Sequence, residues 1–374
     1  MKGVLLIDEA GPFSAPMRER HLQAEFGEVP RPLERPDVVE RAQFCPAQLL
    51  EQSAGLGPPL DICALRISCH LLILTSIESG PMSRRGDSSP SRSPLYNSVE
   101  RKHRIPVALK VTLLGTGTSH GVPMIGCDCA TCRSTDPRDT RTRPSILIQG
   151  TDSGSSGSPF QQAVRHVLVD TSTDLRMQAL TQGVRRVDAI LFTHSHADHI
   201  LGLDEVRRFN AVQKSAIPAY GDARTVADLR RTFSYIFDER TYEGGGIPKV
   251  TLSTIAGPFS LGGLEVVPVP VLHGKRPILG YRIGSFAYLT DCSAIPDSSW
   301  PLLEGVRTLV IDALRRKPHP THFTLDQAVE AAARIGATRT RFTHVCHDLG
   351  YVETCARLPP GMELAYDGQV LDVE

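Results

Sequence analysis

Three histidines and an aspartate lie within one short segment. The stretch Leu191–Gly202 reads LFTHSHADHILG and carries His194, His196, Asp198 and His199 at H-x-H-x-D-H spacing, directly after an apolar run. A buried structural histidine needs one or two hydrogen-bond partners, so packing explains one of these side chains but not the set. Imidazole and carboxylate groups are common metal ligands. The segment therefore predicts a cation site, with the first two histidines on one metal and the next two residues facing a second position.

Three more residues of ligand type follow later apolar runs. His273 occurs in PVLHGKR, Asp291 in YLTDCS and His344 in FTHVCH. Loops at the ends of strands commonly carry function in α/β proteins. With the first four residues they make seven imidazole and carboxylate groups, enough for two divalent ions. Such mixed ligands accept zinc, manganese or iron, so the sequence leaves the metal open.

A second cluster of ligand types consists of cysteines. Cys127, Cys129 and Cys132 have C-x-C-x2-C spacing and supply three of the four ligands that a structural zinc requires. A disulfide framework is not expected in a chain of 374 residues, so the cluster favours metal chemistry in a reducing compartment. We take His347 as the fourth ligand, because the first strand and a late strand are expected to be neighbours. Free thiols and an ordinary surface histidine are the alternatives.

The elements that position these residues begin near residue 105. Helical patterns at 200–212, 223–237 and 324–336 separate short β-rich runs, and Thr324 and Gly336 have the residue types of an N-cap and a C-cap. This alternation predicts a mixed α/β class with helices on the sheets. The β-rich runs lie at 107–117, 145–148, 166–170, 189–192, 217–220, 264–271, 286–291, 308–313 and 340–345. The Ser/Gly-rich run GTDSGSSGS is predicted to be a flexible hairpin insertion.

Residues 1–105 differ in composition from residues 106–374. They contain many prolines and the low-complexity run SRRGDSSPSRSPLYNS, without a sustained period, which predicts a disordered N-terminal extension. One hypothesis is an early start codon, with Met82 as the internal alternative. The N-terminal apolar run is too short for a signal peptide, and the run near residue 70 is too short and too polar to span a bilayer. These features predict a cytoplasmic protein without a membrane segment.

Charge gives no sign of a polyanionic partner. The 41 basic residues balance the 41 acidic ones, so an anionic substrate must be held by a local site. Arg138, Arg141 and Arg143 can bind phosphate in bidentate fashion, but we favour a solvated basic loop. The run GTGTSHG lacks G-x-G-x-x-G spacing and no helix pattern follows it, which disfavours a dinucleotide site. We interpret it as a tight loop leading to the cysteines.

The ordered set H-x-H-x-D-H followed by His, Asp and His resembles the metallo-β-lactamase superfamily over about residues 105–374. The resemblance implies an αβ/βα four-layer sandwich of two mixed β-sheets with flanking helices and a dinuclear site at one edge. Two ions roughly 3.5 to 4 Å apart lower the pKa of a shared water and clamp the attacking and leaving oxygens. The implied ligands are His194, His196 and His273 for one ion, Asp198, His199 and His344 for the other, and Asp291 as the bridge.

A narrower resemblance, to the phosphoribosyl 1,2-cyclic phosphate phosphodiesterase family, rests on LLGTGTSHGVP, VLHGKRPILGY, YLTDCSAIP and THFTLDQA. That family carries a structural zinc held by three cysteines and a histidine, which implies this role for Cys127, Cys129, Cys132 and His347. His322 matches the family's extra histidine and is expected to protonate the leaving alkoxide, with a helix-start role as the alternative. Asp198 is also counted as catalytic. Asp170 is expected to support a ligand by hydrogen bonding, with a strand-end turn as the alternative.

The resemblance implies a metal-dependent hydrolase of a small phosphodiester such as phosphoribosyl 1,2-cyclic phosphate. The same chemistry leaves carboxyl ester, lactone or thioester hydrolysis open. A tRNA 3'-processing-type nuclease is disfavoured by the neutral charge. A non-catalytic carrier like the pyrroloquinoline quinone biosynthesis protein B is disfavoured because all seven ligand positions are filled here. We expect no membrane or nucleic acid partner, and we leave open whether the chain forms a homodimer.

Overall fold

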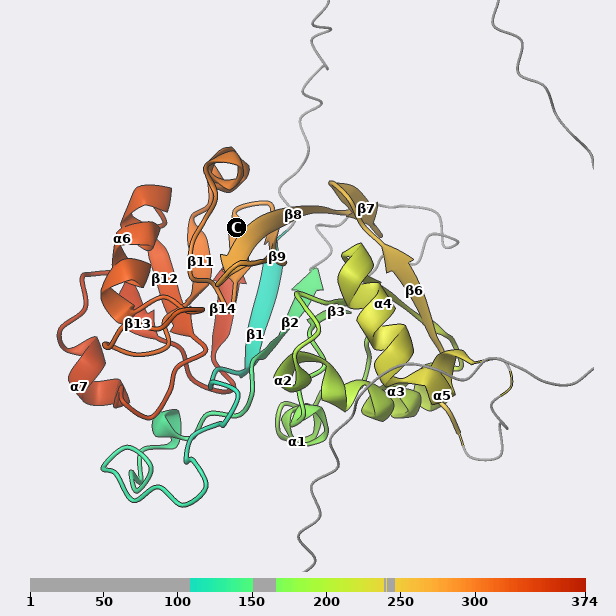
Figure 1. Cartoon of the computed structure of the whole chain (residues 1–374), viewed down its shortest axis with the longest axis horizontal. Coiled ribbons are helices and arrows are strands. Elements are labelled where there is room, and N and C mark those ends of the chain that lie inside the picture. Colours follow the sequence, from blue (N-terminus) through green and yellow to red (C-terminus); the bar gives the residue numbers. More distant parts are fainter. Residues whose placement is uncertain (1–107, 151–165, 239, 241–245) are drawn as a thin grey trace, which may run out of the picture. The chain divides into compact units, whose positions relative to one another are not determined.

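Two β-sheets make up the centre of the computed structural model, which describes residues 108–150, 166–238, 240 and 246–374 (Figure 1). The first sheet has the order β14 (Val370–Val373), β1 (Leu109–Gly115), β2 (Ser145–Gly150), β3 (His166–Val169), β4 (Ala189–Leu191), β5 (Ile217–Gly221) and β6 (Val250–Thr254). The second has the order β13 (Met362–Leu364), β12 (Arg339–Thr343), β11 (Thr308–Asp312), β10 (Phe286–Leu289), β9 (Arg276–Ile283), β8 (Leu264–His273) and β7 (Phe259–Leu261).

Each sheet is antiparallel in one half and parallel in the other. In the first, the pairs from β14 to β3 are antiparallel and those from β3 to β6 are parallel. In the second, the pairs from β7 to β10 are antiparallel and those from β10 to β13 are parallel. Parallel neighbours need crossover connections, which here carry the helices. The carboxyl ends of the parallel strands therefore open onto the loops that connect strands to helices.

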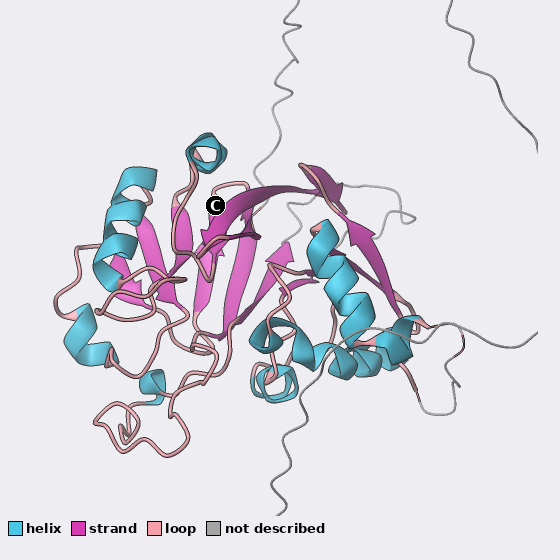
Figure 2. Ribbon diagram, in the orientation of Figure 1, coloured by secondary structure: helices cyan, strands magenta, loops and turns pink. Residues whose placement is uncertain are grey.

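Helices cover the outer faces of both sheets (Figure 2). The first sheet carries α1 (Leu175–Thr181), α2 (Ala197–Ile200), α3 (Val206–Gln213), α4 (Ala223–Thr232) and α5 (Ser234–Phe237). The second carries α6 (Leu325–Ile335) and α7 (Tyr351–Cys355). Short segments of 3-10 helix lie at Pro137–Asp139, Leu201–Glu205 and Asp297–Leu303. The order of layers is helix, sheet, sheet, helix, as the sequence predicted.

Side-chain alternation along the strands creates three apolar layers. On β3, Val167 and Val169 enter the core between the sheets, whereas Leu168 faces the helices of the first sheet. On β11, Val310 faces the core between the sheets, and Leu309 faces the helices of the second sheet. Strands buried on both faces show near-continuous apolar runs, which explains HVLV and TLVI in the sequence. Apolar layers thus cover both faces of each sheet, and this packing positions the ends of the strands.

Most predicted elements are confirmed, with two differences in the helices. The pattern at 200–212 begins as the 3-10 turn Leu201–Glu205 before α3 starts, and the pattern at 223–237 breaks at Phe233. Phe233 leaves helical geometry, with φ −110° and ψ 45°, while its ring stays buried in the layer outside the first sheet. Thr324 forms a capping box with Gln327, and Gly336 ends α6 in the left-handed region, as predicted.

Two predictions fall on parts of the chain that the structure does not describe. The predicted N-terminal extension, residues 1–105, and most of the Ser/Gly-rich insertion lie outside the described residues. The boundary near residue 105 therefore stays a prediction. Among the described residues, none of the helices has the length and apolar character needed to cross a membrane.

Candidate functional site

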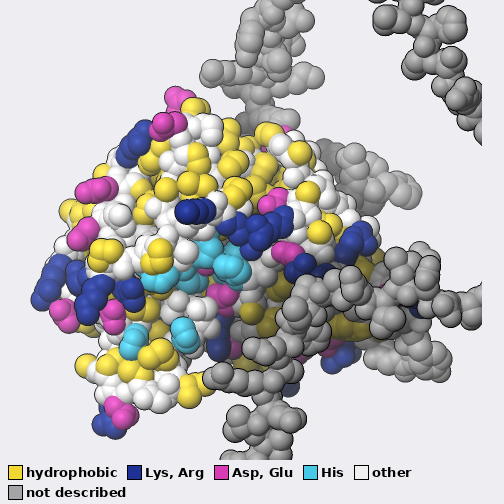
Figure 3. Space-filling model, in the orientation of Figure 1, with side chains coloured by type: hydrophobic (Ala, Val, Ile, Leu, Met, Phe, Trp, Pro, Cys, Tyr) yellow, Lys and Arg dark blue, Asp and Glu magenta, His cyan; other side chains and the backbone are white. Residues whose placement is uncertain are grey.

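The predicted ligands of the dinuclear centre come together at the carboxyl ends of strands from both sheets. His194 follows β4, Asp291 follows β10 and His344 follows β12, while His273 ends β8. Space-filling atoms show a group of histidines with acidic side chains between them on one face of the molecule (Figure 3). Residues separated by up to 150 positions in the sequence thus share one site because both sheets direct their strand ends to it.

Three residues at these strand ends have left-handed backbone conformations. Asp170, Asp291 and His344 have φ of 62°, 54° and 58°, and among the described residues Lys214 is the other non-glycine residue with positive φ. Such a conformation costs free energy for a residue with a Cβ, and it persists only where the surrounding structure holds it. Strained residues cluster at functional sites. Here the left-handed backbone directs Asp291 and His344 toward one group of ligand-type atoms, and Asp170 toward the Nδ1 of His199.

The ligand-type atoms form two groups. Within each group, the ligand-type atoms all lie within 4.8 Å of one another. These atoms are imidazole nitrogens in one group, and imidazole nitrogens and carboxylate oxygens in the other. The first group consists of His194, His196 and His273, and the second of Asp198, His199, Asp291 and His344. All are buried except His196, which is exposed and leaves one side of the site open to solvent. The structure therefore brings together all seven residues that the sequence singled out, in the grouping that the resemblance implied.

Asp291 lies between the two groups. Its Oδ1 is 3.1 Å from the Nε2 of His199, and its Oδ2 is 3.2 Å from the Nε2 of His344 and 3.9 Å from the Nε2 of His194. One carboxylate thus faces histidines of both groups with both oxygens. A bridging carboxylate in a two-metal site occupies such a position.

The ring nitrogens of these histidines suit metal ligation. The Nε2 atoms of His194, His199 and His344 are buried, and none has a hydrogen-bond partner among the described residues. An unpaired buried polar atom costs about 1–3 kcal/mol. Three such atoms facing the same carboxylate are explained if each donates its lone pair to a cation. Because the donors are imidazoles and carboxylates, the set fits zinc, manganese or iron.

The opposite ring edges of these ligands are held by protein groups. The Nδ1 of His199 lies 2.8 Å from Oδ2 of Asp170, and the same carboxylate accepts hydrogen bonds from the backbone N–H and hydroxyl of Thr193. The Nδ1 of His273 lies 2.8 Å from the carbonyl of Thr321. Contacts of this kind fix the tautomer and orientation of a metal-binding histidine. The predicted supporting role of Asp170 agrees with its buried position behind His199.

The electrostatics of the site call for a cation. Burial alone would lower the pKa of a histidine, yet Asp291 and Asp198 raise the pKa of His199 well above its usual value and that of His344 to about 9. Burial would raise the pKa of Asp291, but His344 and His199 hold it well below its usual range. The carboxylates thus attract positive charge so strongly that buried histidines retain protons. Divalent ions would satisfy the same field.

His322 lies at the edge of the seven candidate ligands, which we call the dinuclear group after the two ions that the resemblance implies. Its side chain is 8% exposed, its ring stacks on that of His344 with 4.6 Å between centroids, and one of its nitrogens lies within 4.8 Å of ligand atoms of His273 and Asp291. Burial and the positive charge of His344 lower the pKa of His322 to about 3, so the ring is neutral at pH 7. The structure brings this predicted residue to the site, and it places the ring beside the ligands, not at the exposed start of α6.

Asp312 is a site residue that the sequence reasoning missed. It is completely buried at the end of β11, and its Oδ1 lies 3.3 Å from Nδ1 of His322 and 3.7 Å from Nδ1 of His344. Its other oxygen accepts a hydrogen bond from the backbone N–H of Phe323. Burial raises the pKa of Asp312 well above its usual value. The available signal was an acid directly after an apolar strand in TLVIDA, the same pattern that singled out Asp170 and Asp291.

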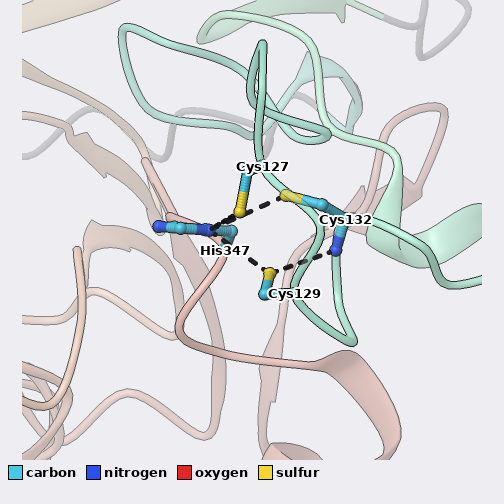
Figure 4. Close-up of side chains that lie close together, drawn as sticks. All are labelled: Cys127, Cys129, Cys132 and His347. Atoms are coloured by element: carbon cyan, nitrogen blue, oxygen red, sulfur yellow. Dashed lines mark hydrogen bonds between the residues drawn. The ribbon is translucent and has the colours of Figure 1, made fainter.

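The three cysteines and His347 form a separate cluster (Figure 4). The Nδ1 of His347 lies 3.1, 3.3 and 3.7 Å from the Sγ atoms of Cys127, Cys129 and Cys132. Tetrahedral ligands about 2.0–2.3 Å from one zinc ion are roughly 3.5 Å apart, so this spacing fits a zinc site. The N–H of Cys132 donates to the Sγ of Cys129 and lowers the pKa of Cys129 to about 6, which favours a thiolate.

The first strand and a late strand were expected to be neighbours, and the structure confirms this for the loops that follow them. β1 and β12 belong to different sheets, and the loops that follow them meet in an isolated parallel bridge between Gly117 and Val345. The N–H of Val345 donates to Thr116, and the N–H of Thr118 donates to Val345. This bridge lies between His344 and His347 in the sequence, so one loop serves both clusters.

Known protein families and solved structures are similar to this chain in sequence and fold. Residues 165–345 match the Beta-lactamase superfamily domain. The solved structure of a diphosphatase from the PhnP family is 45% identical to this chain, and the two align over 71% of this chain and 97% of that protein with a TM-score of 0.63. The chain belongs to the PhnP family of the metallo-β-lactamase superfamily. The predicted superfamily and fold are thereby confirmed, and the chain is a metal-binding hydrolase.

Two further proteins are similar to this chain. An octanoyltransferase from Porphyromonas gingivalis is 38% identical over 262 residues, which are 70% of this chain and 51% of that protein. This chain thus spans about half the length of that relative. Zinc-bound PqqB from Methylobacterium extorquens is 20% identical and aligns over 71% of this chain and all of that protein with a TM-score of 0.53. This last likeness shows the fold alone.

The predicted solvated basic loop is wrong for Arg141. This residue of the PhnP-type domain is completely buried, and its guanidinium lies 2.8 Å from a carboxylate oxygen of Asp139. It also donates to the carbonyls of Cys346 and Leu349. Burying an arginine is tolerated only when its donors are paired, as they are here. Arg141 therefore ties the cysteine-bearing loop to the segment that carries His347.

The neighbouring arginines are also committed to protein partners. Arg138 pairs with Asp136 at 2.7 Å and lies over the ring of Tyr351 at 4.2 Å, and Arg143 pairs with Asp174 at 3.2 Å. Phosphate binding by this loop therefore gains no support. The glycine-rich run before it is a tight loop, as predicted. A Cβ on Gly115 would lie 2.0 Å from the carbonyl of Arg143, so only glycine allows the two segments to approach.

Proposed function

We propose that this chain hydrolyses small phosphodiesters, most concretely a cyclic phosphate such as phosphoribosyl 1,2-cyclic phosphate. The observation that carries the proposal is the position of His322, a buried imidazole that lies beside the seven predicted ligands and that the resemblance does not count among them. A metal site that only binds a ligand has no need of a further proton donor at its edge. Hydrolysis of an alkyl phosphodiester does need one, because an alkoxide is a poor leaving group.

The arrangement of the candidate ligands supports a place for each of two ions. His194, His196 and His273 would hold one ion, and Asp198, His199 and His344 the other, with Asp291 between them. Two divalent ions there would supply a water of lowered pKa and positive charge for the phosphoryl oxygens. Asp170 and Thr321 hold the far edges of His199 and His273, so the ligands keep their orientation during turnover. Asp198 would act as a metal ligand, and this is the catalytic role that we give it.

The proton for the leaving group comes from the pair of His322 and Asp312. Because the Nδ1 of His322 faces Asp312, its Nε2 is the atom left for the substrate. As the water oxygen bonds to phosphorus and the bond to the leaving oxygen breaks, Nε2–H donates its proton to that oxygen. The carboxylic proton of Asp312, whose pKa burial raises, can move to Nδ1 and keep the ring neutral. A positioned acid of this kind typically contributes about 10²- to 10⁴-fold in rate.

A second candidate substrate is a diphosphate diester. The similarity of this chain to the PhnP-family diphosphatase, which is 45% identical over nearly its whole length, favours this candidate. The bond broken is then a phosphorus–oxygen bond whose leaving oxygen belongs to a phosphate. The named activity of the octanoyltransferase belongs to a protein of which this chain spans about half, and the histidine-rich site offers no basis for transferring it. Lactone, ester or thioester hydrolysis and a carrier role remain the rival proposals.

A substrate panel on one preparation tests the proposal. The protein is stripped with a chelator, reconstituted with zinc or manganese, and assayed on cyclic phosphates, bis(p-nitrophenyl) phosphate, a diphosphate diester, a structured RNA and a lactone. We expect turnover of the small phosphodiesters that is absent without metal. Turnover of the lactone alone would replace the proposal by carboxyl ester chemistry. Metal binding with no turnover of any substrate would favour a carrier.

A further inference from the structure

A cavity of about 280 Å³ lies between the dinuclear group and the cysteine cluster. Three loops line it, those that follow β1, β11 and β12. His322 contributes to its wall on the side of the dinuclear group, and His347 contributes on the side of the cysteines. The cavity is at the small end of the range for ligand pockets, so it suits part of a small substrate.

The position of His322 assigns this cavity to one part of the substrate. In the proposed reaction, the scissile phosphate contacts the ions and the leaving oxygen accepts the proton from Nε2 of His322. The leaving portion must therefore extend from His322 away from the ions. The cavity begins at His322, so it is the space that receives the leaving portion.

The charge inside the cavity comes from Arg315. Within the described part of the chain it is the one arginine or lysine among the lining residues, which also include His319 and His120. Its Nε donates to the carbonyl of Lys317 at 3.2 Å and its Nη2 to that of Pro318 at 3.1 Å, which holds the guanidinium in place. The acid of the cavity, Asp348, lies 3.7 Å from the Nε2 of His347, at the ring edge opposite the Nδ1 that faces the cysteines.

We propose that Arg315 selects substrates whose leaving portion carries a phosphate of its own. A guanidinium prefers a phosphate partner because its donors match two phosphate oxygens. The side chain is held before the substrate arrives, so little rotamer freedom is lost on binding. This inference rests on the proposed function and deepens it. The chemical class includes both a phosphorylated sugar alkoxide and the phosphate released from a diphosphate diester.

A matched substrate pair tests the inference. Steady-state kinetics of the metal-loaded protein are measured on ribose 1,2-cyclic phosphate with and without a 5-phosphate, which alters the leaving portion and not the scissile bond. We expect a KM at least about 10-fold lower for the phosphorylated substrate. Arg315→Gln should raise that KM about 10- to 100-fold, the usual scale for a hydrogen bond to a charged group, with kcat nearly unchanged. The KM for the unphosphorylated substrate should stay within about threefold.

Arg316→Gln is the control variant, since Arg316 is the exposed neighbour and does not line the cavity. It should keep the preference for the phosphorylated substrate. Ribose 5-phosphate should inhibit the wild-type protein and Arg316→Gln competitively and should inhibit Arg315→Gln at least about 10-fold more weakly. Equal losses on both substrates in Arg315→Gln would mean that Arg315 only holds the loop carrying His319 and His322, and would overturn the inference.

The other outcomes separate this inference from the proposed function. Turnover of both cyclic phosphates without a preference would overturn the inference alone, whereas no turnover of these or of bis(p-nitrophenyl) phosphate would overturn both. A nucleoside diphosphate sugar distinguishes the two kinds of leaving portion. His322→Ala should lower the turnover of this sugar far less than the turnover of the cyclic phosphate, because a phosphate leaves more readily than an alkoxide.

Discussion

The two ligand clusters share one loop yet differ in burial and in the origin of their ligands. The dinuclear group takes its ligands from the ends of strands in both sheets, and every ligand except His196 is buried. The cysteine cluster takes three ligands from one loop and the fourth from His347, and all four are half-buried. A chemical centre needs ligands fixed by a rigid scaffold, whereas a structural zinc can itself fix the loop that binds it.

Coordination separates the clusters further. Three thiolates and one imidazole would complete the tetrahedron of a zinc ion, so a metal held by the cysteine cluster would leave no position for substrate. The dinuclear group has an exposed ligand, a cavity beside it and a buried imidazole at its edge. We therefore expect substitutions in the first cluster to change stability and those in the second to change turnover. The following variants test this division, from the largest expected effect on turnover to the smallest.

Replacing the bridging carboxylate should have the largest effect. Asp291→Asn removes a charge that faces histidines of both groups, so the protein should lose at least one equivalent of metal and about 10³-fold or more in kcat on bis(p-nitrophenyl) phosphate. Elemental analysis and the rate measurement check both effects. Asp297→Asn, an exposed substitution in a 3-10 turn, is the control and should change neither. Full metal content in Asp291→Asn would contradict the bridging position.

His322→Ala should show a loss that depends on the leaving group. On a ribosyl cyclic phosphate the rate should fall about 10²- to 10⁴-fold, because the alkoxide loses its proton donor. On bis(p-nitrophenyl) phosphate it should fall far less, since nitrophenolate is stable without a proton. His166→Ala removes a histidine on β3 that belongs to neither cluster and should leave both rates unchanged. Metal loss in His322→Ala would instead make His322 a ligand.

Asp170→Asn should have a smaller effect, through metal affinity. Asp170 holds the Nδ1 of His199 at 2.8 Å and touches no substrate, so its loss should weaken metal binding about 10- to 100-fold. Titration with a competing chelator measures the affinity, and activity should return at high metal concentration. Asp372→Asn on β14 is an exposed control. If added metal does not restore activity, Asp170 has a role beyond orienting His199.

Much of the site was predictable from the sequence because its residue types are unusual at strand ends. The H-x-H-x-D-H segment and a histidine or aspartate after each later apolar run identified the seven candidate ligands that the structure brings together. Asp312 follows the same rule and was missed because it lies inside TLVIDA, a run that we interpreted only as a strand. The sequence also gave no sign of the cavity at Arg315, since three loops far apart in the chain form it.

Burial of Arg141 shows a different limit of sequence reasoning. Basic residues in a polar loop are usually solvated, and nothing local indicates that carbonyls of Cys346 and Leu349 lie above this one. The fold was more accessible, because apolar strands and the caps of α6 are local signals. The break at Phe233 was not, since it depends on the apolar layer that buries the ring.

The smallest effect on turnover is expected from the cysteine cluster. Cys129→Ser removes one thiolate of the set around His347, so metal content should fall by about one equivalent and the Tm should drop. The apolar layers of both sheets remain intact, so the domain should still fold, and kcat on bis(p-nitrophenyl) phosphate should stay within a few-fold. Differential scanning calorimetry and elemental analysis measure the two effects.

The matched control is Cys355→Ser, which removes a thiol that lies outside both clusters and should keep the full metal content. If Cys129→Ser has the same Tm as the wild-type protein, the cysteines are free thiols. Cys129→Ser could also lose as much turnover as Asp291→Asn while it retains the ions of the dinuclear group. This result would show that the cysteine cluster affects turnover and not only stability. The shared segment from His344 to His347 is where such coupling would arise, because the bridge between Gly117 and Val345 positions both histidines.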